Sequence, residues 1–166
     1  MTNNKIRLGI VGIGNMGSEH CRTILAGKCP EVELAAVADL RPERRAWAKE
    51  ALPESVQIFG SGSDLIRSGS CEAVLVSVPH FQHEEICVEA LEHGLDVLCE
   101  KPAAVRASQA ERMIRTAEET GRTLTFMFNQ RTNCTYRALK NLLDSGTLGK
   151  IKRINWIITD WYRTQR

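Results

Sequence analysis

The sequence has no large excess of charge of either sign and no long uninterrupted apolar run. Its 166 residues include 22 Lys and Arg against 20 Asp and Glu, a net charge of +2. That charge is too small, and the basic residues are too evenly spread, for the basic patch that nucleic acid or an anionic membrane surface would require. No apolar stretch reaches the ~18–20 residues needed to span a bilayer. We therefore expect neither nucleic acid nor a membrane as a partner, and the sequence favours a small neutral or anionic ligand.

The cysteines lack the arrangement of a metal site or a disulfide framework. They form no Cys-x-x-Cys pair, and none is grouped with histidine at metal-ligand spacing. No signal peptide precedes them, so we expect reduced thiols in a cytoplasmic protein without a bound metal. The six are Cys21, Cys29, Cys71, Cys87, Cys99 and Cys134.

What the sequence does contain is an alternation of apolar runs and amphipathic segments. Its composition, 43% hydrophobic and 25% charged, matches an ordinary globular domain with one sizeable core. Apolar runs end at turn residues, and most are followed by a segment with helical spacing of apolar residues. This pattern predicts a doubly wound α/β fold, in which helices cover both faces of a parallel sheet. The predicted strands are 6–14, 32–39, 56–60, 71–79, 95–100 and 123–130, and the predicted helices between them are 15–27, 41–52, 63–69, 80–94 and 108–121.

The alternation changes after residue 130. Residues 136–149 have the spacing of an amphipathic helix, and the following residues alternate apolar and polar side chains, which predicts an antiparallel strand over 150–162. We therefore expect a Rossmann domain over residues 1–128. Residues 129–166 would be a crossover helix and the first strand of a second, α+β domain that is cut short.

The stretch GIVGIGNMG places three glycines in Gly-x-Gly-x-x-Gly spacing at the end of the first predicted strand. Gly12 permits the tight turn, Gly14 lets the backbone approach a pyrophosphate, and Gly17 lets the next helix pack close to the sheet. Backbone N–H groups at the start of this helix, at Asn15 and Met16, would bind the phosphates. The spacing alone is a weak signal, but a strand before it and a helix after it are the context that a dinucleotide site requires.

A carboxylate at the end of the second predicted strand strengthens this interpretation. Asp39 lies about 20 residues beyond the glycines, the offset at which an acid binds the hydroxyls of the adenosine ribose. It would repel a 2′-phosphate, which favours NAD over NADP. Arg41 points the other way, because its guanidinium could hold a 2′-phosphate or stack on adenine, although a solvated arginine at a helix start explains it equally well.

The tripeptide Glu100-Lys101-Pro102 directly follows the fifth predicted strand. Ligands of doubly wound sheets bind beyond the carboxyl ends of the strands, so these charges are expected to face the cofactor crevice. A solvated surface turn would also contain charged residues and proline. The tripeptide alone does not decide between the two.

Together the motifs resemble the Gfo/Idh/MocA family of oxidoreductases. The resemblance rests on GIVGIGNMG, VADLRPERR, SVPHFQH, EKP and FMFNQR in that chain order, and it covers the whole chain. It implies an NAD-dependent dehydrogenase that transfers a hydride between the nicotinamide and a sugar, inositol or similar polyol. It also implies that Lys101 lies beside the nicotinamide and the reacting carbon, with Glu100 as its carboxylate neighbour. An ammonium there can donate to the substrate oxygen and stabilise developing alkoxide charge.

The resemblance extends to the segment after the fourth predicted strand and to the end of the sixth. Family members carry Thr-Pro-Asn-x-x-His after the fourth strand. Here Pro79 and His83 match, whereas Val78 and His80 stand in place of Thr and Asn, which removes polar contacts near the cofactor but keeps the backbone turn. Asn129 matches the family's Phe-Asn-x-Arg and is expected to contact the cofactor.

Several histidines and aromatics have an equally ordinary explanation. His83 is explained as well by a helix cap or a partly buried position as by a cofactor contact, and we assign no role to His20 and His93, inside predicted helices. The aromatic trio could line a substrate pocket, but aromatics on one strand belong more often to a core or an interface. These three are Trp156, Trp161 and Tyr162.

The resemblance also implies parts that this sequence does not contain. Family members have a second domain with substrate contacts, a catalytic histidine with its aspartate, and usually a homo-oligomer interface. We therefore expect a cofactor domain that is inactive alone. A non-catalytic dinucleotide-binding or redox-sensing module is the alternative. A methyltransferase is a third possibility, in which Asp39 would bind a ribose but Lys101 would have no role.

Overall fold

The computed structural model describes residues 5–157 of the chain. Contacts between Cα atoms divide the chain into two compact units, with the boundary between Met127 and Phe128. None of the helices in the described range is long and apolar enough to cross a bilayer.

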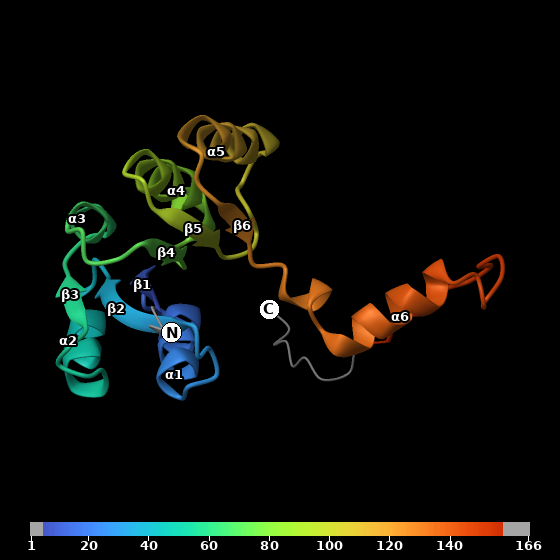
Figure 1. Ribbon diagram of the computed structural model, residues 1–166, viewed down its shortest axis with the longest axis horizontal. Coiled ribbons are helices and arrows are strands. Elements are labelled where there is room, and N and C mark those ends of the chain that lie inside the picture. Colours follow the sequence, from blue (N-terminus) through green and yellow to red (C-terminus); the bar gives the residue numbers. More distant parts are fainter. Residues whose placement is uncertain (1–4, 158–166) are drawn as a thin grey trace, which may run out of the picture. The chain divides into compact units, whose positions relative to one another are not determined.

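The first unit is built on a parallel sheet with the strand order β3-β2-β1-β4-β5-β6 (Figure 1). Every neighbouring pair in this sheet is parallel. The order reverses between β1 and β4, and ligands of such sheets bind in the crevice at that reversal. The strands are β1 (Ile6–Val11), β2 (Val32–Ala38), β3 (Gln57–Phe59), β4 (Ala73–Val76), β5 (Asp96–Cys99) and β6 (Leu124–Phe126).

Helices cover both faces of the sheet, so the predicted doubly wound fold is confirmed (Figure 1). One face is covered by α1 (Asn15–Leu25) and α2 (Pro42–Ala51). The other is covered by α3 (Gly62–Arg67), α4 (His83–Glu92) and α5 (Ala107–Thr120). A short 3-10 helix, η1 (His80–Gln82), precedes α4.

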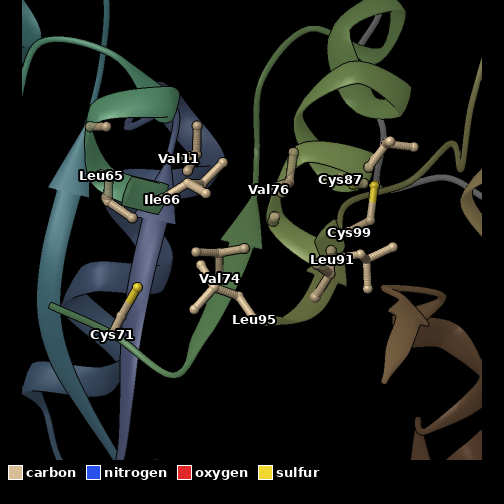
Figure 2. Packing of buried hydrophobic residues seen from close by; sticks show 14 of the residues in the cluster. Val11, Leu65, Ile66, Cys71, Val74, Val76, Cys87, Leu91, Leu95 and Cys99 are labelled. Carbon is tan, nitrogen blue, oxygen red and sulfur yellow. The ribbon is translucent and has the colours of Figure 1, made fainter. Parts of the chain in front are cut away.

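The strands divide their side chains between two apolar clusters, one under each helical layer. In β4, Val74 and Val76 pack toward α3 and α4, whereas Leu75 packs on the opposite face. Figure 2 shows the cluster under α3, α4 and α5, with Val74 and Val76 near Leu65 of α3 and Leu91 of α4. Because both faces are buried, the strands read as nearly continuous apolar runs, which made them visible in the sequence.

The helix boundaries follow local signals in the sequence. Pro42 occupies the first turn of α2, where its missing N–H costs nothing. The Ser61 hydroxyl accepts from the Asp64 N–H and caps α3. Gly121 ends α5 in the left-handed conformation, with φ of 64°.

The second unit contains η2 (Asn129–Arg131) and α6 (Cys134–Asp144) within its described residues. α6 begins two residues before the predicted helix, because the Asn133 side chain caps it by accepting from the Thr135 N–H at 2.9 Å.

The predicted strand over 150–162 is wrong for the residues that the structure describes. Residues 151–157 adopt no regular secondary structure, and residues 158–162, with Trp161 and Tyr162, lie outside the described residues. A strand is stabilised by a neighbour that accepts and donates its backbone hydrogen bonds. The described part of this unit offers no such neighbour to residues 151–157. Trp156 instead stacks on Tyr136 of α6, with ring centroids 5.4 Å apart.

Candidate cofactor-binding site

A cavity of about 960 Å³ lies among the segments that follow β1, β2, β3, β4 and β5. This volume lies at the upper end of the usual range for small-molecule sites. Its lining includes ten of the predicted site residues: Gly12, Gly14, Asn15, Met16, Asp39, Arg41, Val78, Pro79, Glu100 and Lys101. Those not in its lining are Gly17, His80, His83 and Asn129.

The three glycines of the turn have different surroundings. A Cβ atom on Gly12 would lie 2.7 Å from the Ser77 carbonyl oxygen, and φ at Gly12 is +88°. A Cβ on Gly17 would lie 2.0 Å from the carbonyl oxygen of Gly12. At Gly14 the nearest atom would be Nη2 of Arg41, at 3.6 Å. Gly12 and Gly17 are therefore required by the fold itself, whereas the space in front of Gly14 is open to the cavity.

The N-terminus of α1 opens onto the same cavity. Gly14 is the N-cap, no side chain caps the helix, and the first turn carries no acidic residue. Backbone N–H groups in a first turn have no partner within the helix, and the helix dipole gives this end a partial positive charge. Asn15 and Met16 line the cavity at this point. The arrangement suits a pyrophosphate.

Asp39 is buried directly after β2 and joins the glycine turn to the start of α2. Its Oδ2 accepts from the Ile13 N–H at 3.0 Å, and its Oδ1 accepts from the Arg41 N–H at 2.9 Å. Nε of Arg41 also lies 3.3 Å from Oδ1. A carboxylate has about four acceptor positions, so Asp39 retains capacity for a ribose hydroxyl.

Two arginines, Arg41 and Arg44, line the cavity together with Asp39. Arg41 is not simply solvated, because its guanidinium is held by Asp39. Arg44, one helical turn further along α2, also lines the cavity, and its Nη2 lies 3.4 Å from Oδ1 of Asn15. The sequence reasoning missed Arg44, although its spacing from Arg41 places both on one face of a helix.

The loop after β5 brings both Glu100 and Lys101 to the lining of the cavity. The Lys101–Pro102 peptide bond is cis. Glu100 is buried, and its N–H donates to the Val76 carbonyl at 2.9 Å. Its Oε2 accepts from the Lys101 N–H at 3.1 Å, and its Oε1 lies 2.8 Å from Nε2 of His20. His20, to which we assigned no role, is therefore part of the site's support.

His83 is fully buried between two loops. Its Nδ1 lies 2.9 Å from the Pro102 carbonyl oxygen, and its Nε2 lies 3.0 Å from the Val78 carbonyl oxygen. Burial alone would lower the pKa of His83, but the hydrogen bond with Cys99 and the two carbonyls outweigh it, and the pKa is raised. His83 thus ties the loop after β4 to the loop that carries Lys101.

Cys99, the last residue of β5, completes this buried group. Figure 2 shows it beside Cys87 of α4. Sγ of Cys99 lies 3.3 Å from Nδ1 of His83. The hydrogen bond from Cys87 lowers the pKa of Cys99 to about 6, against the effect of burial and with the help of His83. The same contact with Cys99, together with burial, raises the pKa of Cys87.

The remaining predicted residues lie elsewhere. His80 is exposed in η1, where its ring lies edge-on to Phe81. Asn129 begins η2 in the second unit, and its carbonyl accepts from the Thr132 hydroxyl. Within residues 5–157, no three His, Cys, Asp or Glu side chains are grouped so that they could hold a metal ion.

The fold and the cavity together define a class of protein. A glycine turn leads from β1 into a helix without a side-chain cap, an acid directly follows β2, and the cavity lies where the strand order reverses. These are the features of a dinucleotide-binding Rossmann domain.

The family follows from comparison with known proteins. Residues 6–128 match the model of the Gfo/Idh/MocA oxidoreductase family, NAD-binding Rossmann fold. The chain belongs to this family, which confirms the resemblance seen in the sequence and identifies NAD as the cofactor.

Curated relatives and solved structures of the family match most of this chain. Inositol 2-dehydrogenase from Salmonella typhimurium is 34% identical over 146 residues, which are 87% of this chain and 43% of that protein. Inositol 2-dehydrogenase from Rubrobacter xylanophilus is 36% identical over 87% of this chain and 41% of its own length.

The solved structures include scyllo-inositol dehydrogenase from Lactobacillus casei with bound NAD(H) and scyllo-inositol. It is 28% identical, has a TM-score of 0.80 and covers 87% of this chain and 42% of its own. The WlbA dehydrogenase from Bordetella pertussis, in complex with NADH and UDP-GlcNAcA, is 30% identical with a TM-score of 0.79, over 86% of this chain and 43% of its own. The chain thus spans less than half the length of the relatives it matches.

Proposed function

We propose that this chain is the cofactor-binding part of a dehydrogenase that oxidises a CH–OH group of inositol, a sugar or a similar polyol. The observation that carries the proposal is that Lys101 lines the same cavity as Gly14 and Asp39. The names of the matched relatives support the substrate class, since they include inositol 2-dehydrogenases and a structure with bound scyllo-inositol.

Each part of the cavity has a task in this reaction. The backbone at Gly14, Asn15 and Met16 binds the pyrophosphate, and Asp39 accepts from the adenosine ribose. NAD, when bound, supplies the hydride acceptor. Lys101 donates a hydrogen bond to the substrate hydroxyl oxygen and stabilises the negative charge that develops there as the hydride leaves. The hydroxyl proton would pass to a base, the histidine that the family resemblance implies in the second domain.

The cavity supports a preference for NAD over NADP. A 2′-phosphate would meet the buried carboxylate of Asp39, and the Arg41 guanidinium that could compensate for it is already bound to that carboxylate. We propose NAD as the better ligand, with NADPH binding more weakly.

The family resemblance also supports proposals about residues 129–166, the oligomeric state and the cellular location. We propose that residues 129–166 belong to the start of a substrate-binding domain, and that the whole protein is a cytoplasmic homo-oligomer. Light scattering of the purified protein and fractionation of the source cells test these two points.

The test of catalysis is the loss of turnover in Lys101→Met. The assay uses NAD with a panel of polyols, on this chain and on a chimaera that joins residues 1–128 to the remaining sequence of the Salmonella relative. We expect Lys101→Met to lower kcat by about 10²–10⁴-fold, with little change in NADH affinity. Lys101→Arg should not rescue it, because the planar guanidinium does not replace a compact ammonium. NADH binding without turnover in both proteins would favour the non-catalytic module instead.

A further inference from the structure

Lys101 follows a carboxylate in the chain, yet its ammonium has no ionic partner among residues 5–157. Seven ion pairs occur in that range, and none includes Lys101. The only hydrogen bond that links Lys101 to Glu100 comes from the backbone N–H, not from the side chain. Lys101 lines the cavity, so its ammonium, which is unpaired in the described part of the chain, is available to a ligand there.

Two donors other than the lysine ammonium set the orientation of the Glu100 carboxylate. The Lys101 N–H donates to Oε2 at 3.1 Å, and Nε2 of His20 lies 2.8 Å from Oε1. A carboxylate only accepts hydrogen bonds, so Nε2 of His20 must carry the hydrogen. Each oxygen of this buried carboxylate thus has a donor that is not the lysine ammonium.

His20 is held where this contact is possible. It lies in α1, the helix whose N-terminus forms the glycine turn, and its partner is 80 residues further along the chain. Its side chain is 20% exposed, and that of Glu100 is 8% exposed. The contact therefore lies largely out of water, where hydrogen bonds to charged groups are strong.

We propose that His20 is a positioning residue that holds the Glu100 carboxylate away from the Lys101 ammonium, so that the ammonium stays available in the cavity. The inference rests on the proposed role of Lys101 at the substrate oxygen. If His20 is removed, Oε1 of Glu100 becomes a buried acceptor without a donor, which is costly. The ammonium on the adjacent residue is then the closest remaining donor in sequence, and the two would pair.

The test measures the reactivity of the Lys101 amine in this chain, without cofactor. Only the unprotonated amine reacts with acetic anhydride, and pairing with a carboxylate favours the protonated form. Mass spectrometry of the peptide that contains Lys101 gives its acetylation rate at constant pH. We expect His20→Leu to slow it by roughly three- to tenfold. His20→Gln, which keeps a donor, should stay near the rate of the unmodified chain.

The decisive variant is the double change His20→Leu/Glu100→Gln. Removing the charge of Glu100 removes the partner that captures the ammonium, so the rate should return toward that of the unmodified chain. A purely structural role of His20 predicts no such recovery. His93→Leu is the matched control, because His93 follows α4, its ring contacts the Glu89 carbonyl of that helix, and within residues 5–157 it is not in the lining of the cavity. The rate at Lys49 provides an internal reference.

Two results would overturn the proposal: an unchanged rate in His20→Leu, or a double variant as slow as the single one. If His20→Leu does not fold, His20→Met takes its place, since it also removes the donor and its flexible, unbranched side chain fills irregular space. NADH binding by the unmodified chain is measured in parallel. Its absence would reject the proposed function, whereas the acetylation rates report on His20 alone.

Discussion

At the scale of the residue, the glycine turn separates what the fold needs from what a ligand needs. A Cβ on Gly17 would overlap the Gly12 carbonyl oxygen, whereas a Cβ on Gly14 would enter open space. We expect Gly17→Ala to lower the free energy of unfolding by about 3 kcal/mol, as overpacking does, and Gly14→Ala to leave it nearly unchanged. Thermal melts of the two variants check this. Equal losses of stability would show that Gly14 is also a structural residue.

The choice of cofactor should depend on Asp39 and Arg41 as a pair. We expect Asp39→Ala to bring the affinities for NADH and NADPH closer together, because the repelling charge is gone and Arg41 is released. Arg41→Ala should weaken NADPH more than NADH. Fluorescence titration with both cofactors measures these changes. Tighter binding of NADPH than of NADH by the unmodified chain would mean that Arg41, not Asp39, sets the preference.

The raised pKa of the buried His83 fixes the direction of its own contribution to stability as the pH changes. The pKa of His83 is raised above its ordinary value of 6.5, so the folded state keeps this proton to a higher pH than the unfolded state. Its contribution to stability is fully present below about pH 6.5 and is lost as the pH rises through the raised value. The lowered pKa of Cys99, about 6, contributes with the opposite sign: its stabilisation is lost as the pH falls through that value.

Because these two contributions oppose each other, the ring of His83 should be titrated directly by NMR. We expect Cys99→Ala to lower the pKa of His83, since the thiol contact that offsets burial is removed. Cys71→Ala is the control, because Cys71 is buried on the same face of the sheet but does not appear among the groups that shift His83. An unchanged pKa in Cys99→Ala would contradict this account.

Sequence reasoning reached the residues whose role depends on local chain geometry. The first two glycines of the turn, Asp39 and Lys101 follow the ends of β1, β2 and β5, and all four line the cavity. The side-chain partners of His20 and Arg41 could not be predicted, because each contact joins residues that only the folded chain orients toward one another. His83 was left open between a cofactor contact and a buried position. The structure places it in the interior, bonded to backbone carbonyls.

At the scale of the element, too, the features that local sequence determines could be predicted, and those that depend on contacts in the folded chain could not. Buried parallel strands are apolar throughout, so the sequence alone predicts the six strands of the sheet and the helices between them. Residues 150–157 also alternate apolar and polar side chains, but this alternation shows only that the segment could pair with a neighbouring strand. The described part of the second unit contains no strand beside residues 151–157, and these residues adopt no regular structure.

This segment carries exposed apolar side chains and should mediate self-association. Ile154 is 74% exposed and Ile157 is 84% exposed, and such surfaces are rare on monomeric proteins when they are contiguous. We expect the 166-residue chain to associate as its concentration rises, and Ile154→Lys/Ile157→Lys to shift it toward the monomer. Light scattering measures both.

Val105→Lys is the control for that experiment, because Val105 is 54% exposed but lies in the first unit. If the unmodified chain were a monomer at every concentration, or if the double variant associated as strongly, this segment would not be the contact.

At the scale of the whole molecule, the chain matches its relatives over less than half of their length. Its first unit nonetheless has a cavity with Gly12, Gly14, the acid after β2 and the lysine after β5 in its lining. We therefore expect this cavity to bind NAD(H), with the pyrophosphate at Gly14.

The most direct test is a fluorescence titration in which NADH binding is measured for the unmodified chain and for Gly14→Ala, at a temperature where thermal melts show both to be folded. We expect saturable binding of NADH to the unmodified chain and at least a tenfold loss of affinity in Gly14→Ala, because the added methyl group occupies the space that the pyrophosphate needs. No saturable binding to the unmodified chain, or equal affinity in the two proteins, would contradict it.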